Sequence, residues 1–274
     1  MGQQTIKDVQ NKILETMLFI DKLCREYEIT YYIMGGTALG AIRHGGFIPW
    51  DDDLDIFMTP ENYRKFKTIF NKIESEKYVL QEWNIHKNHL QYAKIRMNGT
   101  TFIEEAFKNR KDLHHGIYVD IMILHKCPTN KFIQKVIYYE SKYLTLVALS
   151  ERNWKPKNIT QKLTSNILKY LPNKILVSLM HNHIYKYEDL KTDFSYCYFI
   201  TKANFNQGIF NKEIFELPID IPFEEVYLKG PTDIKKYLEL RYGDYMELPS
   251  LEQQKLAIHA EIYDTEEGFE KYIF

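Results

Sequence analysis

Carboxylates alternate with apolar residues in the stretch from Asp51 to Phe57, which reads Asp-Asp-Asp-Leu-Asp-Ile-Phe. This alternation is typical of a strand, predicted here over 53–58, and it directs Asp53 and Asp55 to the same face. Neighbouring carboxylates repel each other unless a proton or a cation lies between them. Oxygen ligands on a rigid strand suit Mg²⁺ or Mn²⁺, which also accept phosphate oxygens from a substrate. The pattern therefore predicts a divalent metal site formed by Asp51, Asp53 and Asp55.

Two other interpretations of the acidic stretch are a calcium loop and a solvated turn. Acids at alternating positions match the first ligands of an EF-hand loop. The match then fails, because Ile56 stands where that loop requires glycine and Asn62 where it requires a bidentate glutamate. A solvated acidic turn accounts for Asp51 and Asp52, but it does not account for acids that alternate with Leu54 and Ile56.

A glycine turn precedes the acids. The segment 31–33 is aromatic and β-branched, as in a short buried strand, and Gly35 and Gly36 permit a sharp turn with close approach of a ligand to the backbone. Thr37 is a potential cap for a helix over 38–44. A strand, a glycine turn and a helix N-terminus together present free backbone N–H groups, which is the geometry that binds phosphate. Gly35, Gly36 and Thr37 are therefore predicted to bind a phosphate group.

Two further strands carry charged residues inside apolar runs. Asp120 lies within the predicted strand 116–124, where an unpaired carboxylate is costly to bury. It is either a hydrogen-bonded core acid or a third acid of the metal site. Lys94 and Arg96 alternate with apolar residues in the predicted strand 90–97. They are either solvated charges on an edge strand or a clamp for phosphate.

The residues from Tyr31 to Tyr63 resemble the LicD family within the nucleotidyltransferase fold, the phosphocholine transferases of bacterial surface glycans. Fukutin-type ribitol-phosphate transferases are distant relatives of that family. The resemblance continues more weakly through 92–96, 116–121 and 242–249. It implies an α+β fold with a nucleotidyltransferase-like mixed β-sheet flanked by helices, together with a helical subdomain. The expected units are a catalytic core at 1–128, a helical subdomain at 129–192 and a segment at 193–274 that packs back on the core.

The family resemblance implies a specific reaction. Asp53, Asp55 and Asp120 would be the catalytic acids and, with Asp51, the ligands of Mg²⁺. The donor would be CDP-choline or a similar CDP-alcohol. Phosphocholine would pass to a hydroxyl of a glycan, a lipid-linked glycan or a teichoic acid precursor, and CMP would leave. Two alternatives stay open: a nucleotidyltransferase that moves NMP from an NTP to a small acceptor, and a non-catalytic member that binds nucleotide or metal.

Substrate binding is expected to involve the glycine turn, several cations and an aromatic ring. The predicted substrate-binding residues are Gly35, Gly36, Thr37, Arg43, Trp50, Lys94 and Arg96. Trp50, Phe47 or Tyr118 is expected to face the trimethylammonium group through a cation–π contact. No role is assigned to His114, His115 or His259.

Composition narrows the class of protein. The 274 residues carry a formal net charge of −1, which argues against a nucleic-acid binder that relies on a basic surface. The three cysteines are scattered, which fits a reduced compartment and provides no zinc framework. The polar amino end lacks a signal core, and no apolar run is long enough to span a bilayer. The expected location is the cytoplasm, with at most peripheral contact at the inner face of the membrane.

The rest of the chain is predicted mainly as helix. Apolar residues at helical spacing predict helices over 6–27 and 60–73, and longer ones over 130–152 and 160–187. The segment 218–222, bounded by two prolines, is predicted to be a turn-rich link.

Overall fold

The computed structural model of this chain describes residues 4–82, 92–150, 173–199, 204–255 and 258–273. These residues form an α+β fold around a five-stranded mixed sheet with the strand order β1-β2-β6-β4-β3. The strands of this sheet are β1 (Tyr32–Ile33), β2 (Asp55–Met58), β3 (Tyr78–Gln81), β4 (Tyr92–Met97) and β6 (Tyr118–Ile123). β2 and β6 are parallel, and the other neighbouring strands are antiparallel. The predicted α+β class is confirmed.

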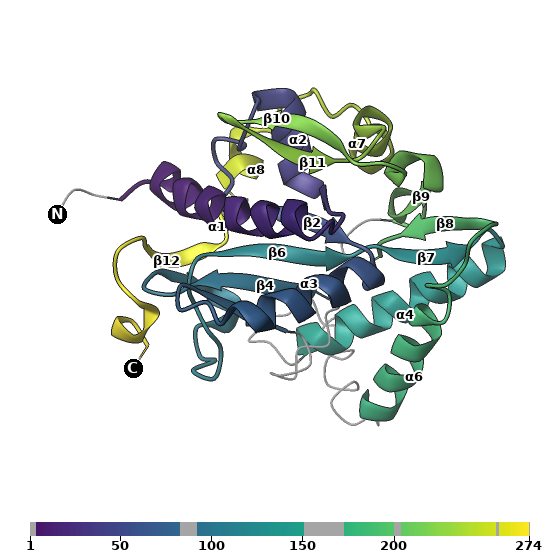
Figure 1. Cartoon of the computed structure of the whole chain (residues 1–274), viewed down its shortest axis with the longest axis horizontal. Coiled ribbons are helices and arrows are strands. Elements are labelled where there is room, and N and C mark those ends of the chain that lie inside the picture. The colour runs from purple at the N-terminus through teal and green to yellow at the C-terminus, as the bar shows by residue number, and fades with distance from the viewer. Residues whose placement is uncertain (1–3, 83–91, 151–172, 200–203, 256–257, 274) are drawn as a thin grey trace.

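Helices cover this central sheet (Figure 1). The predicted amino-terminal helix is α1 (Ile6–Glu26), which packs along β6 and β4 and begins with a capping box formed by Thr5 and Asp8. α2 (Gly35–His44) and α3 (Pro60–Ile73) both pack against β2. Burial of their apolar faces is the main stabilising contribution, because an isolated helix of this length is marginal in water.

Three smaller sheets surround the central one. Their strands are β5 (Thr101–Glu104) with β12 (Ala260–Asp264), β10 (Ile219–Phe223) with β11 (Val226–Gly230), and β7 (His125–Pro128) with β8 (Phe194–Cys197) and β9 (Ile209–Asn211). The predicted turn at 218–222 is wrong, because β10 occupies these residues. Ile221 and Phe223 alternate into the core, and Pro222 is tolerated because β10 has a partner on one side only.

The other helices and 3₁₀ turns of the described residues follow β5 in the chain. They are α4 (Lys131–Ser150), α6 (Asn173–Tyr185), α7 (Ile234–Tyr242) and α8 (Leu251–Lys255), with 3₁₀ turns η1 (Glu105–Phe107), η2 (Asn206–Gly208), η3 (Lys212–Phe215) and η4 (Phe269–Lys271). The part of the predicted helix 160–187 before residue 173 lies outside the described residues. α4 and α6 pack on β7 around a second hydrophobic cluster, separate from the main core. The predicted division into three units stays a prediction.

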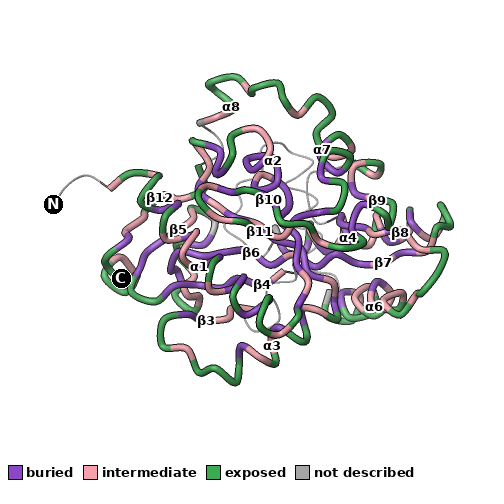
Figure 2. Tube along the Cα trace, turned by 45° about the horizontal axis from the view of Figure 1, so that its top comes forward, coloured by how far each residue is buried: buried purple, intermediate pink, exposed green. Residues whose placement is uncertain are grey.

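The main core lies between the sheet and its helices. Figure 2 shows the buried residues concentrated along β6 and β4, while exposed residues collect at the periphery, for example around α8. The cysteines Cys24, Cys127 and Cys197 are buried free thiols. Among the described residues, no helix combines the length and the apolar character needed to cross a membrane.

Candidate active site

The central feature of the site is a pair of acids on neighbouring strands. Asp55 on β2 lies directly opposite Asp120 on β6 in the parallel register, and the Asp120 N–H donates to the carbonyl of Leu54 at 3.0 Å. Side chains in register on adjacent strands project from the same face of a sheet. The strands that carry these acids are therefore neighbours, as a third acid at position 120 requires, and the assignment of Asp120 to the metal site stays a prediction.

Asp53 reaches the same acid group from outside the strand. β2 begins at Asp55, so the predicted strand 53–58 is shorter than expected at its start. The segment before β2 turns instead, with the Asp51 N–H donating to the carbonyl of Ile48 at 2.9 Å. Burial, and then the nearby charge of Asp120, raise the pKa of Asp53 to about 6, while the charge of His259 opposes this rise.

The acids repel one another in a buried environment. Burial, followed by the charges of Asp53 and Asp120, raises the pKa of Asp55 well above its usual range. Burial also raises the pKa of Asp120, although Lys94 opposes that change. A divalent cation would relieve this repulsion, and a donor set made only of carboxylates is the kind that Mg²⁺ and Mn²⁺ bind. The type of donor therefore fits such an ion. The ligand atoms of Asp53, Asp55 and Asp120 do not all lie within 4.8 Å of one another in this structure, so their side chains would have to turn toward one point to hold it.

Lys94 is the counter-ion of Asp120. Its Nζ lies 2.8 Å from one carboxylate oxygen of Asp120 and 3.0 Å from the other. It also lies 3.3 Å from the centroid of the Tyr118 ring. The alternative of a solvated edge charge is wrong, because β4 lies between β6 and β3 and Lys94 is only 6% exposed.

Arg96 is buried as well, and its donors contact protein groups. The guanidinium donates to Gln81 Oε1 at 2.7 Å and to the carbonyl of Gly116 at 2.8 Å. It lies 4.7 Å from the centroid of the Tyr118 ring, the same ring that contacts Lys94. The predicted clamp on phosphate by these two cations stays a prediction.

The glycine turn forms the first turn of α2. The helix begins at Gly35 rather than at residue 38, and Met34 is its N-cap without a side-chain hydrogen bond. Gly35 adopts φ +53°, a conformation that favours glycine, and its N–H donates to Tyr237 Oη at 2.9 Å. Thr37 does not cap the helix. Its hydroxyl instead accepts a hydrogen bond from the Asp55 N–H at 2.8 Å, which fixes α2 against the start of β2.

Asp51 lies beside the same helix N-terminus. A Cβ placed on Gly36 would lie 2.8 Å from Asp51 Oδ2, so a larger residue here would require this carboxylate to turn away. The N–H groups of Gly36 and Thr37, in the first turn, have no acceptor within the helix. Burial and the charge of Asp53 raise the pKa of Asp51 to about 8. We call the first turn of α2, at Gly35, Gly36 and Thr37, the phosphate seat, and Asp53, Asp55 and Asp120 the acid group. The phosphate seat therefore lies beside the acid group.

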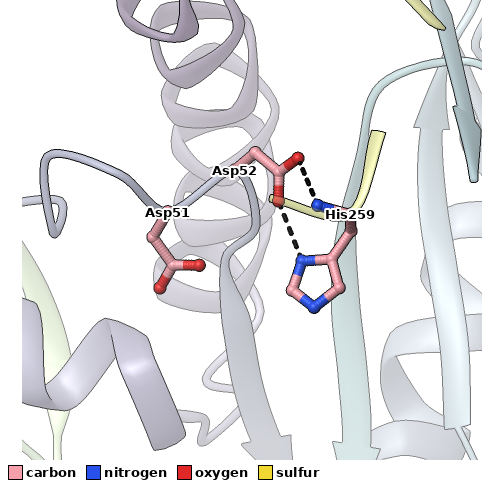
Figure 3. A group of neighbouring side chains, drawn as sticks. All are labelled: Asp51, Asp52 and His259. Atoms are coloured by element: carbon pink, nitrogen blue, oxygen red, sulfur yellow. Dashed lines mark hydrogen bonds and ion pairs between the residues drawn. The ribbon is translucent and has the colours of Figure 1, made fainter. Parts of the chain in front are cut away.

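Asp52 binds the carboxyl-terminal segment, a contact that the sequence analysis misses. Its carboxylate accepts hydrogen bonds from the N–H groups of His259 and Ala260 at 2.8 and 2.9 Å. A third contact at 2.8 Å joins its Oδ1 to His259 Nδ1 (Figure 3). Asp52 is 1% exposed, so the solvated-turn interpretation is wrong for this residue. The hydrogen bond with Asp52 raises the pKa of His259 to about 9.

A second arrangement of potential metal ligands results from this contact. Across the described parts of the chain, one group of three possible ligand atoms, from Asp51, Asp52 and His259, lies within 4.8 Å of one another. Asp52 already accepts three hydrogen bonds from residues 259 and 260. We therefore assign Asp52 to positioning the loop rather than to binding an ion.

A cleft adjoins the acid group and contains two of the predicted substrate-binding residues. Arg43, Trp50 and Asp51 line it together with residues 242–250, and its volume is about 850 Å³. Arg43 donates to the backbone carbonyls of Tyr245 and Glu247, each at 3.1 Å. These bonds hold the segment after α7 against α2 and form one wall of the cleft.

Comparison with known proteins gives a consistent picture. Residues 28–156 match the family model described as LicD/FKTN/FKRP, nucleotidyltransferase domain. The chain is 28% identical over 261 residues to the lipopolysaccharide cholinephosphotransferase LicD of Haemophilus influenzae, covering 93% of this chain and 96% of that protein. It is also 31% identical over 125 residues to an uncharacterised protein of Rickettsia prowazekii, covering 44% of this chain and 42% of that protein.

Proposed function

Because the chain belongs to the LicD family, we propose that it transfers phosphocholine from CDP-choline to a hydroxyl of lipopolysaccharide or a related cell-surface glycan, with release of CMP. The observation that carries this proposal is the register of Asp55 with Asp120 beside the N-terminus of α2. That register places two carboxylates side by side on one face of the sheet, next to backbone N–H groups suited to phosphate. A nucleotidyltransferase-like arrangement of the central sheet is part of the same proposal.

Four acids would hold a divalent ion. Asp53, Asp55 and Asp120 would be three of its ligands, and Asp51, at the border of the phosphate seat, would be the fourth. Mg²⁺ bound there would neutralise charge on the diphosphate as its bond breaks. The raised pKa values of Asp53 and Asp55 are consistent with this assignment, since they reflect burial first and then the charges of neighbouring carboxylates.

The chain's own groups have distinct roles in the transfer. The N–H groups of Gly36 and Thr37 bind one phosphate of the donor at the start of α2. Lys94 holds Asp120 in place through contacts to both carboxylate oxygens. Asp120 takes the proton from the acceptor hydroxyl, a role that its raised pKa favours.

The transfer is a single displacement at the phosphorus that carries choline, in which one bond forms and one bond breaks. The acceptor oxygen forms a bond to the phosphorus that carries choline, and the bond from that phosphorus to the bridging oxygen of CMP breaks. The proton of the hydroxyl passes to Asp120, and CMP leaves with the bridging oxygen. Because this chemistry uses a cytoplasmic nucleotide donor, we place the reaction in the cytoplasm or at the inner face of the membrane.

Product analysis tests this proposal against a nucleotidyltransferase. The purified protein is incubated with Mg²⁺ and phosphocholine-free lipopolysaccharide, and either CDP-choline or CTP is added. Release of CMP from CDP-choline, with phosphocholine found on the acceptor by mass spectrometry, supports the proposal. Release of pyrophosphate from CTP, without CMP from CDP-choline, contradicts it. Asp53→Asn with unchanged turnover would contradict both enzymatic functions.

A further inference from the structure

We propose that the cleft between α2 and residues 242–250 binds the trimethylammonium group of the donor and selects choline over primary amines. This inference rests on the proposed transfer of phosphocholine and identifies the part of the molecule that chooses the alcohol. The cleft has a volume of about 850 Å³ and includes Asp51, which borders the phosphate seat at Gly36. A donor whose phosphates lie at that seat can therefore extend into the cleft.

Tyr242 provides a second connection between the cleft and the acids. Its ring lines the cleft, and its hydroxyl lies 3.8 Å from the position of a Cβ built on Gly35. The same Cβ position lies 3.4 Å from Asp55 Oδ2. The cleft and the in-register acids are thus adjacent. This is required because choline is bonded directly to the phosphate that reacts beside the acids.

The lining of the cleft matches a cation without hydrogen-bond donors. Trp50, Tyr242 and Tyr245 contribute aromatic rings, and Asp244 and Glu247 contribute carboxylates. A quaternary ammonium is attracted to the faces of aromatic rings and to nearby negative charge, and it makes no demand for acceptors with defined geometry. Primary ammonium groups are more strongly hydrated and lose more on entering such a site.

Arg43, the one arginine among the described lining residues, donates its hydrogen bonds to backbone carbonyls of the cleft wall. Arg43 donates to the carbonyls of Tyr245 and Glu247, so its charge contributes to holding the wall. Asp244 and Glu247 outnumber the single charge of Arg43, so the lining has a surplus of negative charge without counting Asp51. A negative lining disfavours a second phosphate in the cleft and favours a cation.

The other aromatic rings considered from the sequence have different surroundings. Lys94 Nζ lies 3.3 Å from the centroid of the Tyr118 ring, so a cation of the protein already occupies that face. Phe47 is 7% exposed and packs edge-on against Phe223, with centroids 4.9 Å apart. Trp50 is the member of the three that lines the cleft.

Selectivity between two donors tests this inference. We compare kcat/KM for CDP-choline and CDP-ethanolamine in the wild type and in Trp50→Leu, Tyr245→Leu and Glu247→Gln. Each variant is expected to lower the ratio of the two values, and Trp50→Leu by about tenfold, because it removes one cation–π contact. Trp50→Phe keeps an aromatic face and should restore most of the ratio. Tyr227→Leu and Glu266→Gln, exposed residues that do not line the cleft, should leave it unchanged.

Direct binding distinguishes this inference from the proposed function. Saturation-transfer NMR with tetramethylammonium should give a signal in the wild type that weakens in Trp50→Leu, whether or not CMP is released in the assay. If the wild type releases CMP from CDP-choline but all three variants keep the wild-type ratio, the cleft inference is overturned and phosphocholine transfer stands. A Trp50-dependent signal from CMP, with none from tetramethylammonium, assigns the cleft to the nucleotide and also overturns it.

Discussion

At the scale of single residues, the acid group combines close packing with uncompensated charge. Lys94 offers one positive charge to a group of carboxylates in which Asp120 is buried and Asp53 and Asp55 are partly buried. His259 adds a second cation, with its Nδ1 3.6 Å from Asp53 Oδ2, but these two charges cannot neutralise the three acids together with Asp51 and Asp52. The group is therefore held together by the fold of the loop and the two strands, and it gains stability when a divalent cation is added.

Replacing one acid should separate stability from activity. In Asp55→Asn, we expect turnover with CDP-choline to fall by about a hundredfold or more, because roughly 3 kcal/mol of transition-state stabilisation is lost. Melting in EDTA should occur at the wild-type temperature or above, since one charge leaves a repulsive group. Adding Mg²⁺ should raise the melting temperature of the wild type but much less that of the variant. Asp220→Asn, a change at a surface acid, is the control and should keep both responses.

A buried histidine away from the site should set part of the acid sensitivity. His125 is 5% exposed, and its ring nitrogens have no hydrogen-bond partner among the described residues. Burial lowers its pKa to about 3 from the usual 6.5. Below pH 6.5, His125 is therefore protonated in the unfolded chain but stays neutral in the folded chain. The free energy of unfolding consequently falls as the pH is lowered toward 3.

His125→Leu should remove this dependence. We expect its free energy of unfolding to exceed that of the wild type by about 1–2 kcal/mol at pH 7, because two unpaired polar atoms leave the core. The gain should grow between pH 6.5 and 4. Urea unfolding at several pH values measures both effects, and parallel pH profiles for the two proteins would contradict the assignment.

At the scale of elements, α2 contains two glycines, Gly36 and Gly40, that are required for different reasons. A Cβ on Gly36 would meet the carboxylate of Asp51 at 2.8 Å, whereas a Cβ on Gly40 would meet the backbone carbonyl of Gly46 at 2.4 Å. A carboxylate on a loop can rotate away, but a packed backbone cannot. The first glycine is therefore suited to the site and the second to packing.

The two alanine variants should have opposite effects. Gly36→Ala should lower turnover by about tenfold or more while leaving stability equal or slightly increased, because alanine favours the helix. Gly40→Ala should destabilise the protein by about 2 kcal/mol or more through overpacking. Thermal melts and CMP release from CDP-choline measure the pair. A Gly36→Ala protein with full activity would argue against a phosphate seat at this turn.

Local patterns predict some of these elements well and others not at all. The pattern shows that Asp55 and Asp120 each interrupt an apolar strand, but it is the family resemblance that implies that they share one site. The strand at 219–223 was mispredicted, since prolines usually indicate a turn but are tolerated at a strand edge. The early start of α2 was also missed, because glycines have low helix propensity and tertiary hydrogen bonds to Gly35 and Thr37 override it.

At the scale of the whole molecule, the carboxyl-terminal segment completes the site from a distance. Asp52 and His259 are separated by 207 positions in the sequence, and no local pattern relates them. The contact appears only once β12 pairs with β5 and brings the segment to the acidic loop. This part of the site could not be predicted from residue spacing.

Removing the Asp52 carboxylate should release this segment. Asp52→Ala leaves two backbone N–H groups without their acceptor, and we expect a loss of about 3 kcal/mol in the free energy of unfolding. Hydrogen exchange followed by mass spectrometry should show faster exchange in 258–264 and in the loop 47–54, with little change in α1. Uniform acceleration across the chain, or none in these segments, would contradict a positioning role.

The position of the metal tests the central claim most directly. Crystals grown with Mn²⁺ and CDP-choline allow the ion to be located by its anomalous scattering. We predict a peak within about 2.0–2.3 Å of carboxylate oxygens from both Asp55 and Asp120, with the donor phosphates beside the start of α2. A peak confined to Asp51, Asp52 and His259, or no peak between the two in-register acids, would contradict this account.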